Sequence, residues 1–142
     1  MLVRFCRVFA VLMLAAAGTA GCDNGSVTTP SPAPTTTDTF AGNLSPNGAT
    51  TYPFIVAALS GGPVTATVAK LTPNTVPIGF SLGTWNDITG VCSAVLANDA
   101  AVETAALTGR TSTAAALCLR VYDAGSIPAD TTLDYTVTVV HP

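Results

Sequence analysis

The sequence predicts an all-β protein, an antiparallel β-sandwich of jelly-roll type with about seven or eight short strands. Two observations carry this prediction. Apolar and polar side chains alternate in several short runs, which is the pattern of a half-buried strand. Turn-forming clusters of Gly, Pro, Asn and Ser separate these runs by about ten to twelve residues, a spacing typical of sandwiches. The composition, 49% apolar and only 9% charged, favours tight β packing.

The predicted strands follow one another through the second part of the chain. The run 50–56 places Tyr52, Phe54 and Val56 on one face. The other predicted strands are 64–71, 78–82, 91–97, 102–107, 117–122 and 133–140. Turn signals lie between them, at 45–48, 60–63, 72–74, 89–90 and 124–126. The stretch 97–106 is ambiguous, because its alanines and single glutamate would also suit a helical turn.

Residues 1–21 are predicted to be a lipoprotein signal peptide. Arg4 and Arg7 precede an unbroken apolar run, 8–17, of about ten residues, which is too short to cross a bilayer alone. Small residues then lead into Cys22, and the segment 19–22 resembles the bacterial lipobox. The resemblance implies that the preceding peptide is cut away and that a diacylglycerol is joined to the cysteine. The alternative is ordinary cleavage nearby, which would leave Cys22 as a free thiol.

Residues 22–37 are predicted to be a tether behind the lipidated cysteine. The segment is rich in Thr and Pro and contains too few apolar side chains to offset the entropy lost on ordering. Its prolines favour an extended spacer. We therefore expect a location in the bacterial cell envelope, lipid-anchored and exposed to the periplasm or the exterior. The lipid on Cys22 makes the membrane the first expected partner.

The remainder, 38–142, has the size of one domain and is sparsely charged. Without the two signal-peptide arginines, its basic residues are Lys70, Arg110 and Arg120, against 8 acidic residues in the chain. No basic patch can form from so few cations. The sequence therefore excludes nucleic acid as an expected partner.

Two cysteines remain in the domain, Cys92 and Cys118, because Cys6 leaves with the signal. In an oxidising compartment such a pair is expected to form a disulfide. Closing a loop of about 27 residues contributes roughly 3 to 4 kcal/mol in the chain-entropy estimate. The alternative, a redox-active or metal-binding pair, is disfavoured because there is no C-x-x-C spacing and no histidine close in sequence.

Five segments together resemble a known bacterial domain. They are 40–46 (FAGNLSP), 51–56 (TYPFIV), 62–68 (GPVTATV), 118–123 (CLRVYD) and 134–139 (DYTVTV). In this order they are similar to the bacterial pre-peptidase C-terminal domain, and the similarity covers nearly all of 39–142. It implies a small, non-catalytic β-sandwich. Such domains usually follow a secreted protease, and some relatives bind collagen or insoluble polymer, but no protease precedes the domain in this sequence.

The sequence predicts no enzymatic activity. The sole histidine, His141, stands beside the last residue and is expected to be solvated, and no hydrolase, phosphate-binding or zinc-protease motif is present. Calcium is the one cofactor considered. Asp123, Asp130 and Asp134 bracket a loop and could gather oxygen ligands around Ca²⁺. The simpler interpretation is that they are solvated turn carboxylates.

A ligand site is expected near Trp85, in a predicted loop with Asn86 and Asp87. The other large aromatic residues considered, Tyr52, Tyr122 and Tyr135, lie within strand patterns and are expected in the core or at its edge. The predicted function is a non-catalytic envelope lipoprotein whose sandwich serves as a structural or protein-interaction module. The alternative is an adhesion module that binds polysaccharide or peptide, with calcium as a candidate helper. For either function, the expected partner of the domain is another exported protein or a surface polymer.

Overall fold

A computed structural model describes residues 34–142. The predicted signal peptide 1–21, the predicted lipidation site Cys22 and most of the predicted tether 22–37 lie outside these residues. Within 34–142 the chain forms β-strands joined by turns, without a helix, and so without one that is long and apolar enough to cross a membrane.

Eight strands make up this part of the chain. They are β1 (Thr36–Leu44), β2 (Ala49–Val56), β3 (Gly62–Thr72), β4 (Ile78–Asn86), β5 (Val91–Ala101), β6 (Ala106–Thr111), β7 (Ala115–Tyr122) and β8 (Leu133–His141). The helical alternative for 97–106 is wrong, because β5 continues through this stretch to Ala101. The predicted strand 102–107 is also misplaced, since 102–105 form a turn and β6 starts at Ala106.

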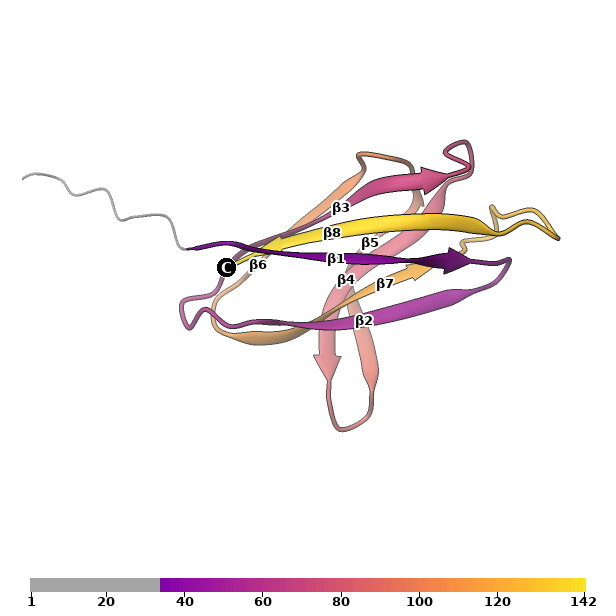
Figure 1. Ribbon diagram of the computed structural model, residues 1–142. Helices are drawn as coiled ribbons and strands as arrows, with labels where there is room; N and C mark the ends of the chain where they lie inside the picture. The colour runs from indigo at the N-terminus through magenta and orange to yellow at the C-terminus, as the bar shows by residue number, and fades with distance from the viewer. Residues whose placement is uncertain (1–33) are drawn as a thin grey trace, which may run out of the picture. The chain divides into compact units, whose positions relative to one another are not determined.

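The strands form two four-stranded sheets, ordered β1-β8-β3-β6 and β2-β7-β4-β5. Every pair of neighbours is antiparallel. Figure 1 shows the two layers, with β1, β8 and β3 running together in one of them. The predicted all-β antiparallel sandwich is confirmed.

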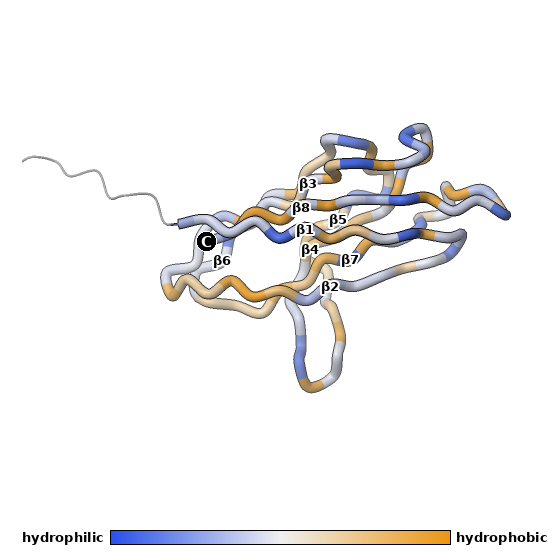
Figure 2. Tube along the Cα trace, viewed as in Figure 1, coloured by the Kyte–Doolittle hydropathy of each residue, from blue (hydrophilic) through white to orange (hydrophobic). Residues whose placement is uncertain are grey.

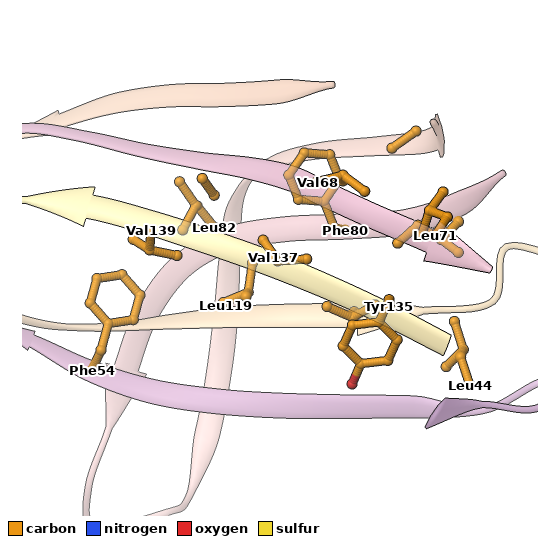
Figure 3. Close-up of a cluster of buried hydrophobic side chains, with 14 of the residues drawn as sticks. Leu44, Phe54, Val68, Leu71, Phe80, Leu82, Leu119, Tyr135, Val137 and Val139 are labelled. Atoms are coloured by element: carbon orange, nitrogen blue, oxygen red, sulfur yellow. The ribbon is translucent and has the colours of Figure 1, made fainter. Parts of the chain in front are cut away.

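The core lies between the sheets and follows the alternation of the strands. In β8, for example, Leu133, Tyr135, Val137 and Val139 are buried while their neighbours are more exposed. Figure 2 shows hydrophobic and hydrophilic residues succeeding each other along most strands. Figure 3 shows side chains from both sheets meeting, among them Val68, Phe80, Leu119 and Val137. Apolar burial of this kind is the main favourable term in folding.

Strand β1 is absent from the alternating runs predicted above. Its inward positions carry Asp38, Phe40, Gly42 and Leu44, so only two of them present a large apolar side chain. Pairing with β8 over the whole length of β1 forms the strand instead. As a result β1 begins at Thr36, two residues inside the predicted tether.

The strand register gives the sandwich two ends. At one end the chain enters at Thr36, which pairs with His141, the segments 57–61 and 112–114 connect the sheets, and the turn 87–90 joins β4 to β5. We call it the tether end. At the other, the distal end, the connections are 45–48, 73–77, 102–105 and 123–132.

Candidate docking site on the β4–β5 hairpin

The hairpin of β4 and β5 extends beyond the rest of its sheet. Strand β7 pairs with β4 only from Gly79 to Thr84, so the last residues of β4 have β5 as their only strand neighbour. Figure 1 shows the hairpin projecting away from the two layers. We call residues 85–95 the finger. Strand β5 is the edge of its sheet, and its outer backbone groups therefore have no strand partner in the described chain.

The finger holds three aliphatic side chains in solvent. Ile88 at the turn is 96% exposed, Val95 is 71% exposed, and Val91 is exposed between them. Figure 2 colours part of the finger turn as hydrophobic, although no other strand covers it. Exposed apolar residues that gather on one element, in contrast to scattered ones, mark interaction surfaces.

A closed network of hydrogen bonds holds the turn at the finger tip. The Asn86 side chain accepts the backbone N–H groups of Ile88 and Thr89, at 3.0 and 3.1 Å. The N–H of Gly90 donates to the carbonyl oxygen of Asn86 at 2.8 Å, and Gly90 adopts a φ of +64°, which favours glycine. Ile88 is therefore presented by a preorganised turn.

A disulfide fastens the base of the finger, as the sequence predicts. Cys92 of β5 and Cys118 of β7 have Cα atoms 5.8 Å apart and an S–S distance of 2.10 Å. The two strands are not neighbours, because β4 lies between them and places Gly83 opposite Cys118. A Cβ atom at Gly83 would overlap the backbone of Ser93, so the close approach of β5 at this point requires glycine.

An apolar groove of about 350 Å³ lies beside β5, between the two sheets. Leu82, Leu96 and Leu117 form part of its wall, and Val95 of the finger lines it as well. The Thr111 hydroxyl in the lining is buried and has no hydrogen-bond partner among residues 34–142. A buried hydroxyl of this kind calls for an explanation, and a bound polar group would supply one.

The predicted ligand site near Trp85 takes a different form in the structure. Trp85 lies on β4, not in a loop, and is half-buried opposite Cys92. Asn86 ends the strand and caps the turn, while Asp87 is exposed within the turn. The three residues thus lie on the finger, but the exposed surface there is formed by its aliphatic residues. Sequence reasoning missed these, although Ile88 between two turn-forming residues was a signal.

The three aspartates of the calcium hypothesis have separate roles. The Asp123 carboxylate accepts four backbone N–H groups, from Asn47, Gly125, Ser126 and Ile127, at 2.8 to 3.1 Å. These bonds, that from Asn47 foremost, lower the pKa of Asp123. Elsewhere, Asp134 pairs with the Asn43 side chain, and Asp130 is exposed on the loop. Residues 34–142 contain no group of three His, Cys, Asp or Glu side chains suited to a metal ion.

His141 is buried, so the expectation of a solvated histidine is wrong. Its Nε2 lies 3.0 Å from a carboxylate oxygen of Asp38, and its ring packs against that of Phe54 in a tilted arrangement, with the centroids 5.4 Å apart. Because β8 pairs with the start of β1, His141 lies beside the first residues of β1. The imidazole joins the two termini of the domain.

The three tyrosines lie in the core or at its edge, as predicted. Tyr135 is buried, and its hydroxyl is 2.7 Å from that of Tyr52. Burial raises the pKa of Tyr135, and the Tyr52 hydroxyl adds to the increase. Burial also raises the pKa of Tyr122 to about 12, helped by its hydrogen bond to Asp99. These phenols hold strands together and do not form an open aromatic platform.

Comparison with models of known protein families gives no match, and a search among curated proteins gives none either. The resemblance to the pre-peptidase C-terminal domain therefore stays a prediction.

Proposed function

We propose that this protein is a non-catalytic lipoprotein of the bacterial cell envelope, which docks on another exported protein through the finger and the adjoining edge of β5. The observation that carries the proposal is the set of exposed aliphatic residues Ile88, Val91 and Val95 on a disulfide-fastened edge strand. An element that is rigid, projecting and apolar at its tip has the properties of a docking element, since little entropy is lost when it binds.

The edge of β5 suits a partner that adds a strand. Residues 91–98 contain no charged side chain. This edge therefore lacks the charges that often prevent an edge strand from pairing with another strand. In strand addition, main-chain hydrogen bonds give affinity and alternate side chains enter pockets. The groove lined by Leu82, Leu96 and Leu117 lies where such side chains would be received.

The disulfide supports the exported location. Bonds of this kind persist in oxidising compartments such as the periplasm and are rare in the cytosol. A signal peptide at 1–21 and a lipid on Cys22 would bring the domain to a membrane surface that faces such a compartment. There, a tethered domain meets its partner at raised effective concentration, so a small interface suffices.

Two observations favour protein docking over the alternative functions. A sugar-binding platform needs an open aromatic face, whereas Trp85 is half-buried on β4. The imidazole of His141 is engaged by Asp38 beneath the entering chain and faces no nucleophilic side chain in the contacts described. The polysaccharide-binding alternative therefore has no structural feature that favours it.

Photo-crosslinking from the finger tests the proposal. A photoreactive amino acid replaces Ile88 in the full chain in its own bacterium, and the matched control places it at Val102, which is exposed at the distal end. We expect one defined envelope protein to be linked from position 88 and not from 102. Ile88→Asp should then reduce co-purification of that protein by at least about tenfold, while Val102→Asp leaves it unchanged.

Equal crosslinking from both positions would contradict the docking surface, as would co-purification that survives Ile88→Asp. The anchor is tested separately by the intact mass of the protein purified from membranes. We expect a chain that starts at Cys22 and carries acyl groups; a chain that starts elsewhere without lipid would disprove the anchor and leave the finger untouched.

A further inference from the structure

The tether end and the distal end of the sandwich differ in charge. The connections that join the sheets at the tether end, 57–61 and 112–114, contain no charged residue, and the finger turn 87–90 holds one acid, Asp87. The distal connections hold Glu103, Asp123 and Asp130. Among the described residues near the chain entry, the acid Asp38 is paired with His141. Arg110, opposite Pro63 in the register, adds a cation at this end. The two connections that join the sheets at the tether end thus carry no acid, and the acid in the turn 87–90, Asp87, lies on the projecting finger.

Exposed apolar side chains gather at the same end. Leu59, in the 57–61 connection, is 86% exposed, and Ile55 near the end of β2 is 68% exposed. Ile55 lines a hollow of about 480 Å³ together with Ala57 and Ala58 of that connection. Large aliphatic residues that are exposed beside a shallow hollow form an apolar surface that is suited to contact a membrane or a protein.

The chain enters the domain inside this hollow. Pro34 and Thr36, the first residues of the described chain, line it with Ile55. Cys22 stands about 12 residues earlier, a span of at most roughly 37 Å at the rise of an extended proline-rich segment. A lipid on Cys22 would therefore hold the hollow, and Leu59 beside it, within reach of the bilayer surface.

We propose that the tether end of the sandwich is a membrane-contacting surface, in which Leu59 and Ile55 insert into the lipid interface. The inference rests on the proposed lipid anchor and assigns an orientation to the anchored domain. The uncharged connections 57–61 and 112–114 can approach an anionic bilayer, whereas the distal connections with their three acids are repelled. The domain then stands on its tether end, with the finger turned toward neighbouring envelope proteins.

Two aliphatic side chains give only weak binding on their own. Burying one leucine or isoleucine strengthens partition into the interface by roughly tenfold, so this contact depends on the tether for its occupancy. This modest strength suits an orienting contact. The lipid on Cys22 keeps the domain at the membrane, and Leu59 and Ile55 decide which end faces it.

The experiment uses the single tryptophan as a movable probe. The chain from Cys22 to Pro142 is coupled through the Cys22 thiol to a maleimide-bearing lipid, since Cys92 and Cys118 are joined to each other. It is placed in vesicles of brominated phosphatidylcholine with a minority of phosphatidylglycerol. One variant carries Trp85→Phe with Leu59→Trp, and the matched control carries Trp85→Phe with Val102→Trp. Chemical coupling makes the result independent of whether the cell lipidates Cys22.

We expect the tryptophan at position 59 to be quenched by bromine and shifted to the blue, and the one at position 102 to fluoresce as in vesicle-free buffer. Leu59→Ser in the uncoupled chain should lower vesicle partition by roughly tenfold, while Val102→Ser leaves it unchanged. Absence of quenching at 59, or equal quenching at both positions, would overturn the inference. Protein adducts from a photoreactive residue at 59, without quenching, would overturn it in favour of a protein-docking end.

Discussion

The finger and the distal loop both hold their turns with hydrogen bonds from polar side chains, but they differ in whether their isoleucine is exposed or buried. At both places side-chain oxygens bind backbone N–H groups, from Asn86 in the finger and from Asp123 in the distal loop. At the distal end, however, the isoleucine of the loop, Ile127, is buried, whereas Ile88 of the finger is in solvent. The difference supports the proposed docking role of the finger, because its turn also holds its backbone by hydrogen bonds and yet leaves Ile88 exposed.

The distal turn 102–105 shows how closely that end is joined to the fold. The Glu103 carboxylate accepts the backbone N–H of Leu71 at 2.8 Å, where the register of β3 shifts. The N–H of Thr104 donates to the carbonyl oxygen of Val68 at 2.8 Å, and Ala105 accepts from Val68 at 2.9 Å. The finger has no such second attachment beyond its disulfide, so the disulfide should matter most.

Among the changes to the disulfide, to Asp123 and to Ile88, removal of the disulfide is expected to lower the free energy of unfolding most. The double variant Cys92→Ala with Cys118→Ala frees a loop of about 27 residues and should lower the free energy of unfolding by roughly 3 kcal/mol. Urea denaturation, followed by circular dichroism, measures the change. Cys22→Ser is the matched control, because it removes a thiol outside the described fold. An unchanged urea midpoint in the double variant would show that the finger is held without the bridge.

Much of the fold could be predicted from the sequence, and the reason is the alternation of the strands. The predicted run 50–56 matches β2 to within one residue at its start, and 133–140 matches β8 to within one at its end. In both strands the apolar positions face the core at every second residue. The disulfide was also predictable, since a predicted signal peptide and a predicted lipid on Cys22 would leave only Cys92 and Cys118 to pair.

The finger could not be placed from the sequence, because long-range pairing forms it. The predicted strand 78–82 ends where alternation stops, yet β4 continues to Asn86 on account of its pairing with β5. After Leu82 the chain carries Gly83 and Thr84, so no apolar alternation marks this continuation. Trp85 was assigned to a loop for that reason.

The sequence analysis also failed to predict the burial of His141 and the role of Asp123, for two different reasons. Burial of His141 follows from the pairing of β8 with β1, which joins residues from opposite ends of the domain. No local pattern contains that information. The role of Asp123, by contrast, could have been found. An aspartate followed by Gly125 and Ser126 is typical of a turn in which the carboxylate accepts nearby backbone N–H groups, and such a carboxylate is occupied without a metal.

Loss of the Asp123 carboxylate is expected to have the second largest effect. Asp123→Ala leaves four backbone N–H groups without their acceptor and should lower the free energy of unfolding by about 2 kcal/mol near neutral pH. The pKa of Asp123 is lowered in the folded state, so its contribution is present above the ordinary pKa and is lost as pH falls through the lowered value. The difference between wild type and variant should therefore shrink in acid.

Urea denaturation at a series of pH values measures this dependence. Asp130→Asn is the matched control, because Asp130 is exposed on the same loop and asparagine tolerates its φ of 64°. We expect the control to follow wild type throughout. A gap between wild type and Asp123→Ala that stays constant down to strongly acidic pH would contradict the assigned role.

Truncation of the finger tip is expected to have the smallest effect on stability. The same truncation in the distal loop should cost more, and this difference distinguishes the two regions. Ile88 is 96% exposed and makes no core contact, so Ile88→Ala should change the free energy of unfolding by no more than about 0.5 kcal/mol. Ile127, which is only 6% exposed, belongs to the core, and Ile127→Ala should cost roughly 2 to 4 kcal/mol. Thermal and urea unfolding of the two variants gives the comparison directly. Equal costs would mean that the finger tip packs on the domain in solution, and Ile88 could then not be a docking residue. A neutral Ile88→Ala would show instead that the fold does not need this side chain, as the proposed docking role requires.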